Sequence, residues 1–295
     1  MELDNIIRYE LNEAISEEMG IADTVKKEGE RFSEKIKNLI KTQDAKKETV
    51  TDNVIKNSYD FYDDIMNENF NVSVVYYNFL TRESFEINSQ NIDYNSAQLI
   101  SDGKKVRFLI IKCYGISGGL DISSLYDSVY HELSHYYQGI YGNKEIFDDD
   151  PKYMTASSYL RSSVKMERDI SLLYYYSKRF EGDGYVNGLY GSLTALNNPI
   201  PKYDDIKNTD AYMAIKQFRF CLTEVSENSE NKEYQNFCQK KYGVSLSKLL
   251  KMAYTSYYRF MRNIGRVLMK IRKDKINEGI HFGISTNRKT CPLII

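Results

Sequence analysis

Apolar residues recur at helical spacing in the first part of the chain. Over residues 3–15 and again over residues 21–40 they fall at steps of three and four, the period of one helix face. The same reading of residues 54–65 predicts a third helix after a polar stretch. The sequence therefore predicts an N-terminal helical segment over residues 1–68.

The pattern then changes to one typical of β-strands. Residues 72–79 are rich in β-branched and aromatic side chains, and residues 96–101 and 104–113 flank Asp102-Gly103, a pair suited to a tight two-residue turn. Residues 121–138 follow without any Pro or Gly to interrupt a helix. We expect a small antiparallel sheet that directly precedes this helix.

Helical spacing returns in the last third of the chain. It predicts helices over residues 210–225, 232–242 and 245–277. On the last of these, one face is basic and is interpreted as a solvated surface; it consists of Arg259, Arg262, Arg266, Lys270 and Lys273. The predicted fold class is α+β and mostly helical, with a core over residues 69–200 and a C-terminal helical subdomain over residues 201–295.

The helix expected over residues 121–138 carries the sequence His131-Glu132-Leu-Ser-His135. Residues four apart on a helix share one face, so His131 and His135 can direct ring nitrogens at one metal ion. Two histidine ligands, an open coordination position for water and a nearby carboxylate are what a zinc peptidase requires. We therefore predict Zn²⁺ as cofactor and Glu132 as the general base.

A catalytic zinc site usually takes a third protein ligand. The candidates are a carboxylate from a following helix, Glu167 or Glu181, or the one remaining histidine, His281. Simple helix-hairpin geometry favours Glu167. The apolar neighbours of Glu181, where a lone carboxylate would be costly, favour Glu181.

The chain resembles the gluzincin group of metallopeptidases, and in particular small uncharacterised members from gut bacteria and their phages. The resemblance covers residues 105–191 and rests on the histidine motif and on Phe180-Glu181-x-x-Gly184-Tyr-Val-Asn187-Gly-Leu-Tyr190. It implies a zincin-like catalytic core over residues 69–200, a bacterial or phage source, and His131, His135 and Glu181 as the metal ligands. Glycines at 182 and 184 depart from good helix-forming sequence.

The composition of the chain limits the kinds of molecule that we expect it to bind. The formal net charge of −1 gives no global attraction to nucleic acid or anionic membranes. Four scattered cysteines without a Cys-x-x-Cys pair are interpreted as free thiols. We find neither a secretory signal nor a membrane-spanning run, so we expect a cytoplasmic protein whose partner is a protein or peptide substrate.

The predicted function is hydrolysis of peptide bonds by a zinc-activated water. The oxyanion that forms needs a donor besides the metal, and Tyr185, Tyr190 and His281 are the candidates. The alternative hypothesis is a non-catalytic zincin-like interaction module. A third, nucleic-acid binding through the basic face of the last helix, would require salt-dependent binding.

Overall fold

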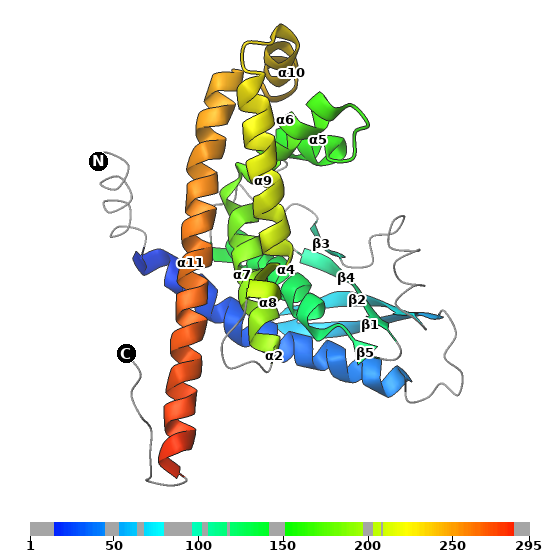
Figure 1. Cartoon of the computed structure of the whole chain (residues 1–295). Helices are drawn as coiled ribbons and strands as arrows, with labels where there is room; N and C mark the ends of the chain where they lie inside the picture. The colour runs from blue at the N-terminus through cyan, green and yellow to red at the C-terminus, as the bar shows by residue number, and fades with distance from the viewer. Residues whose placement is uncertain are drawn as a thin grey trace.

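The structure, a computed structural model, describes residues 15–44, 53–63, 68–79, 96–101, 106–116, 119–141, 151–196, 203–207 and 209–285. It combines helices with one sheet, so the fold class is α+β as predicted (Figure 1). In chain order the elements are α2 (Ile15–Asp44), β1 (Asn53–Asp63), β2 (Glu68–Phe79), β3 (Ser96–Ser101), β4 (Val106–Ile116), β5 (Gly119–Leu120), α4 (Ile122–Tyr141), α5 (Pro151–Tyr159), α6 (Lys165–Tyr176), α7 (Arg179–Ala195), α8 (Tyr203–Lys207), α9 (Asp210–Glu227), α10 (Lys232–Tyr242) and α11 (Leu246–Ser285).

The sheet has the strand order β1-β2-β4-β3, with the short β5 also paired to β4. The expected hairpin is confirmed, since β3 and β4 pair antiparallel from Ser96 opposite Lys112 to Ser101 opposite Val106. The expected antiparallel pairing holds for β1 with β2 and for β3 with β4, whereas β2 and β4 run parallel. The reason is that β3 takes the outer edge, so the hairpin turns β4 back into the direction of β2. The Asp102-Gly103 turn itself lies outside the described residues.

The third predicted N-terminal helix was also wrong, since residues 53–63 form strand β1, antiparallel to β2. Its apolar positions fit a helical period, but its sequence NVIKNSYDFYD is rich in β-branched and aromatic residues and has no Ala, Leu or Glu. Pairing with the next strand along the chain therefore decides the conformation. The helix expected over residues 21–40 lies within α2, and the pattern over residues 3–15 lies almost wholly outside the described residues.

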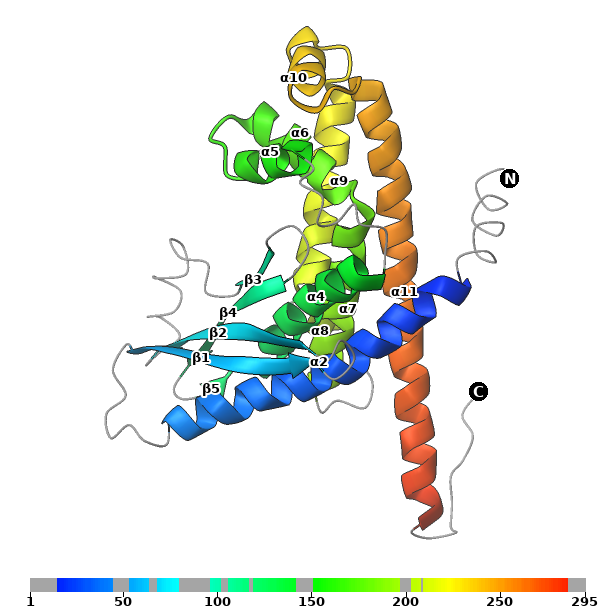
Figure 2. The ribbon, with the colours of Figure 1, turned by 180° about the vertical axis from the view of Figure 1, so that it is seen from behind.

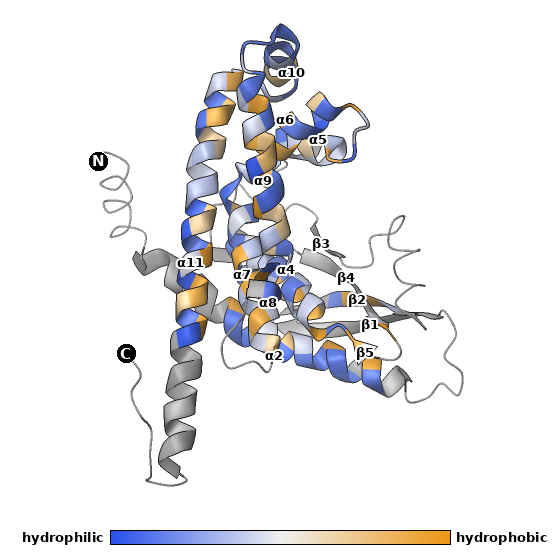
Figure 3. Cartoon of the chain, viewed as in Figure 1, coloured by the Kyte–Doolittle hydropathy of each residue, from blue (hydrophilic) through white to orange (hydrophobic). Residues whose placement is uncertain are grey.

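Helix α4 separates two hydrophobic cores. The first core lies between α4, α2 and the sheet (Figures 1 and 2). Its buried members include Val25, Phe32 and Ile36 of α2, Val72, Val74 and Tyr76 of β2, and Leu125, Val129, Leu133 and Tyr137 of α4. The second core joins α6, α7, α9, α10 and α11. Apolar and polar residues are interspersed along α9 and the coloured part of α11 (Figure 3). The C-terminal helices were predicted correctly, and α10 has the predicted bounds.

A stripe of glycines brings α7 close to α4. Gly184, Gly188 and Gly191 follow one another at steps of four and three on α7. A Cβ atom at Gly188 would lie 2.1 Å from Asp127 Oδ1, and one at Gly191 would lie 2.6 Å from the Tyr130 ring. The absence of side chains at these positions allows the helix backbones to approach, which fixes how α7 lies against the motif helix.

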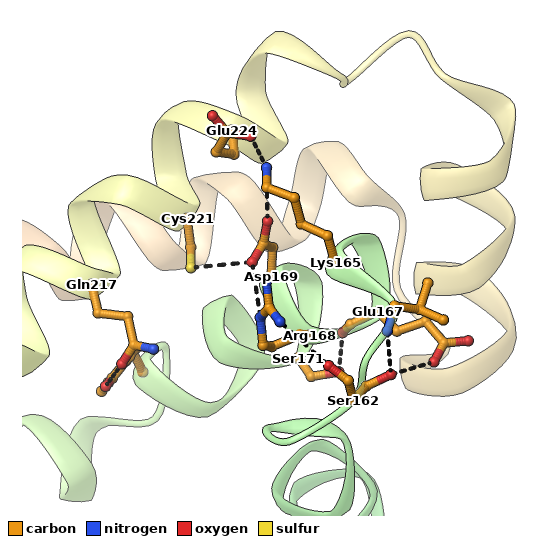
Figure 4. A network of polar contacts seen from close by, with 11 residues as sticks. Ser162, Lys165, Glu167, Arg168, Asp169, Ser171, Gln217, Cys221 and Glu224 are labelled. Atoms are coloured by element: carbon orange, nitrogen blue, oxygen red, sulfur yellow. Dashed lines mark hydrogen bonds and ion pairs between the residues drawn. The ribbon is translucent and has the colours of Figure 1, made fainter. Parts of the chain in front are cut away.

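A polar network joins α6 to α9 in the second core (Figure 4). The buried Asp169 on α6 lies 3.4 Å from the Lys165 ammonium, which also pairs with Glu224 on α9. Asp169 Oδ1 lies 4.0 Å from the sulfur of Cys221. Burial and, to a lesser extent, the charge of Asp169 raise the pKa of Cys221 to about 12, so the thiol stays protonated. Free thiols were predicted for all four cysteines. Among the described side chains, Cys221 and Cys238 are free, as predicted.

None of the helices in the described ranges combines the length and the apolar character needed to cross a membrane.

Two glycines of α7 give a matched test of the close contact with α4. We expect Gly188→Ala to lower the free energy of unfolding by about 1–3 kcal/mol, because its methyl group would overlap the Asp127 carboxylate. Gly182→Ala meets nothing within 4 Å and should raise that free energy by about 0.5–1 kcal/mol. Equilibrium urea unfolding measures both, and equal effects of the two changes would contradict the packing described here.

Candidate metal centre

Helix α4 places the two motif histidines on one face. Their Nε2 atoms are 3.0 Å apart, and the rings meet edge to face with centroids 4.8 Å apart. The side chains are 14% and 12% exposed, so both are largely withdrawn from water but still reachable. The predicted i, i+4 arrangement of His131 and His135 therefore holds in the structure.

Helix α7 brings Glu181 to the same point. Its Oε2 lies 3.8 Å from His131 Nε2 and its Oε1 lies 3.9 Å from His135 Nε2, while the side chain is only 2% exposed. Ligand atoms of all three residues lie within 4.8 Å of one another. We call His131, His135 and Glu181 the His–His–Glu group.

The His–His–Glu group fits a zinc ion. Ligand atoms on a tetrahedral zinc with bonds of about 2.0–2.1 Å lie about 3.4 Å apart. The two Nε2 atoms are 3.0 Å apart, and each lies 3.8–3.9 Å from one of the two Glu181 oxygens, so the observed separations are close to that value. Glu181 Oε2 is buried and has no hydrogen-bond partner within the described part of the chain. A buried carboxylate oxygen in that state is costly, and a cation between it and the two nitrogens would stabilise it.

The second carboxylate candidate lies elsewhere. Glu167 is in the first turn of α6, where its Oε2 accepts a hydrogen bond of 2.9 Å from the Ser162 hydroxyl (Figure 4). Hairpin geometry favoured it on the premise that the helix following α4 would return past His135. Instead α5 and α6 intervene, and α7 is the helix that packs on α4.

Burial sets the charge state of the site. Loss of solvation and, second, the neighbouring His135 hold the pKa of His131 well below its usual value, so the ring is neutral at neutral pH. A neutral imidazole is the form that binds a metal. Gly184 lies directly over the pair, since a Cβ there would be 3.0 Å from His131 Nε2 and 3.1 Å from His135 Cε1. The small residue therefore leaves room for both rings.

A short chain of polar contacts orients His135. Its Nδ1 lies 3.4 Å from Gln138 Oε1, and the Gln138 amide donates to Asp183 Oδ2 at 3.4 Å. Asp183 is in turn 3.5 Å from the Arg179 guanidinium. With the proton on Nδ1, the Nε2 lone pair of His135 is directed to the centre of the His–His–Glu group.

Aromatic side chains that the sequence analysis did not identify surround Glu181. The Tyr153 hydroxyl donates to Glu181 Oε1, and Tyr175 stacks on Tyr153 and interacts with the same carboxylate. Burial, then the charge of Glu181 and more weakly that of Glu132, raise the pKa of Tyr153, so its hydroxyl keeps its proton. Nothing in the sequence distinguishes these two from the rest of the 26 tyrosines in the chain.

The three candidate oxyanion donors lie in different parts of the structure. Tyr185 packs edge to face on His131 with centroids 4.6 Å apart, and burial raises the pKa of its hydroxyl. Tyr190 instead packs against Tyr130 in the contact between α7 and α4, with centroids 6.1 Å apart. His281 falls within α11, but its side chain lies outside the described residues. Tyr185 therefore contacts the His–His–Glu group through His131.

Comparison with known proteins gives no relative: no family model, no curated protein and no solved structure matches this chain. The interpretation of the site therefore depends on its own residues and geometry.

Parallel zinc titrations of two variants test the third ligand. We expect Glu181→Ala to lower zinc affinity by more than about 100-fold, beyond the 10–100-fold typical of changes outside the ligand shell. Glu167→Ala should keep the affinity and cost at most about 1 kcal/mol of stability, because its carboxylate contacts only Ser162 among the contacts described. Loss of zinc in Glu167→Ala with retention in Glu181→Ala would refute this assignment.

Proposed function

We propose that the chain is a zinc-dependent peptidase of the gluzincin type. The observation that carries the proposal is the convergence of His131 and His135 from α4 and Glu181 from α7, beside an intact motif glutamate. A metal held by two histidines and one carboxylate keeps a coordination position open, which is the arrangement of catalytic rather than structural zinc.

The order of elements also supports a zincin-like core. A sheet, the motif helix and a later helix with the ligand glutamate follow one another in the chain, and the last two pack together through the glycine stripe. These are the elements that the resemblance to gluzincins implies for residues 69–200.

Each residue has a definite task in this proposal. His131, His135 and Glu181 hold the ion. When bound, zinc supplies a Lewis acid that polarises the scissile carbonyl and lowers the pKa of a water toward neutrality. Glu132 accepts the proton of the attacking water and passes it to the leaving amine.

The surroundings of Glu132 suit a general base. It follows His131 on α4, its side chain is only 8% exposed, and it is close enough to Tyr153 for its charge to raise the pKa of that hydroxyl.

The sheet offers a place for an extended substrate. Among the described strands β3 pairs only with β4, so within that part of the chain no strand occupies its other edge, and β3 also packs near α4. A peptide added to that edge would be held by main-chain hydrogen bonds alongside the motif helix. This supports a protein or peptide substrate. Backbone contacts alone would give little specificity for the substrate's sequence.

The base is tested by Glu132→Gln. We expect zinc content to stay at about one per chain and peptide hydrolysis to fall by at least about 100-fold, the lower range of a general-base contribution. Zinc-loaded protein is incubated with a mixture of peptides of diverse sequence, and new termini are counted by mass spectrometry. Glu167→Gln serves as the matched control and should cleave like the unaltered chain.

Two results would count against the peptidase. Near-normal cleavage by Glu132→Gln would show that another group is the base. Zinc binding by the unaltered chain without any cleavage would favour the non-catalytic interaction module instead.

A further inference from the structure

Tyr153 lies beside the proposed metal centre but belongs to α5, a helix that contributes no proposed metal ligand. It lies near the start of α5, 28 positions before Glu181 in the sequence. Helix α5 packs on α6 at the side of the long helices (Figure 1). The Tyr153 hydroxyl donates to Glu181 Oε1, and this bond links α5 to the carboxylate of the His–His–Glu group.

The two oxygens of Glu181 have different surroundings. Oε1 accepts the bond from Tyr153 and lies 3.9 Å from His135 Nε2, and Tyr175 interacts with the same carboxylate. Oε2 is buried, has no hydrogen-bond partner within the described part of the chain, and lies 3.8 Å from His131 Nε2. A phenol has a single proton to donate, so it can engage one carboxylate oxygen and leave the other available.

The Tyr153 ring is fixed by contacts that do not involve its hydroxyl. It stacks on Tyr175 with centroids 5.5 Å apart and planes inclined by 18°, and it meets Phe180 edge to face at 5.2 Å. Phe180 also packs edge to face on His135, with centroids 5.7 Å apart. The ring can therefore keep its position when the hydroxyl is removed.

We propose that Tyr153 is a positioning residue for the metal ligand: its hydroxyl holds Oε1 of Glu181 and so fixes the orientation of the carboxylate, with Oε2 toward His131. The inference rests on the proposed metal centre and assigns α5 a part in it. Hydrogen-bonded partners of metal ligands fix ligand orientation, and their loss typically lowers metal affinity by about 10–100-fold.

The test is a zinc titration of Tyr153→Phe in competition with a chelating dye. We expect an affinity about 10–100-fold below that of the unaltered chain. Cobalt(II) provides a second readout, because its visible absorption depends on ligand number and geometry. Loss of the bond from Tyr153 should change the cobalt spectrum of Tyr153→Phe, since Oε1 then lacks the donor that holds it and the Glu181 carboxylate can turn.

Tyr159→Phe is the matched control. Tyr159 lies at the end of the same helix, and its ring contacts Phe237 and the Lys241 ammonium rather than the His–His–Glu group. This variant should show unchanged zinc affinity and an unchanged cobalt spectrum. Thermal unfolding of the metal-free proteins, followed by circular dichroism, establishes that both variants are folded.

The outcomes separate this inference from the proposed function. If folded Tyr153→Phe has the same zinc affinity and cobalt spectrum as the unaltered chain, the positioning role is overturned and the metal centre remains. Failure of the unaltered chain to bind zinc would overturn the metal centre, and this inference with it. A loss in Tyr153→Phe that Tyr159→Phe matches would assign the effect to α5 as a whole and also overturn the role of the hydroxyl.

Discussion

The close approach of α7 to α4 determines the geometry of everything else at the candidate site. Gly184, Gly188 and Gly191 remove the side chains that would hold the two helices apart, and the histidine rings, Asp127 and Tyr130 occupy the space that is left. Helices normally pack 8–10 Å apart, with the distance set by the side chains at the contact. A glycine stripe therefore brings the Glu181 carboxylate within reach of the two rings. The same glycines weaken the intrinsic helix preference of α7, so this helix depends on its tertiary contacts.

The site also shows how a buried carboxylate is accommodated. Glu181 is nearly inaccessible, and the adjacent His131 is held neutral by its own burial, so it offers no full positive charge in return. Hydroxyl groups on α5 and α6 supply part of the missing solvation. An ion would stabilise Glu181 Oε2, which has no hydrogen-bond partner within the described part of the chain. Binding of an ion to the folded chain adds to the stability of the folded state.

The sequence predicted the helical elements and the candidate site better than it predicted the sheet. The histidine motif is local, since its residues are four apart on one uninterrupted helix, and α9, α10 and α11 follow from periodicity alone. Strand β1 was misassigned because the apolar positions of residues 53–63 fit two periods, and only pairing with β2 decides between them. The parallel pairing of β2 and β4 depends on which strand occupies the sheet edge, a property of topology that no local pattern carries. Tyr153 and Tyr175 were missed for a related reason: they reach Glu181 through the tertiary arrangement of α5 and α6.

Asp127 extends the influence of the motif helix beyond the metal centre. Its carboxylate contacts Gly188 on one side, and on the other its Oδ2 accepts from the backbone N–H of Asp210, in the first turn of α9. Burial, followed by the charge of Asp210, raises the pKa of Asp127 well above its usual value. Together with the core that α6 and α7 share with α9, α10 and α11, this contact makes the C-terminal helices part of the scaffold of the site. A fragment that stops near residue 200 would remove the helices that cover one side of α7, so the apolar residues of α7 on that side would face water.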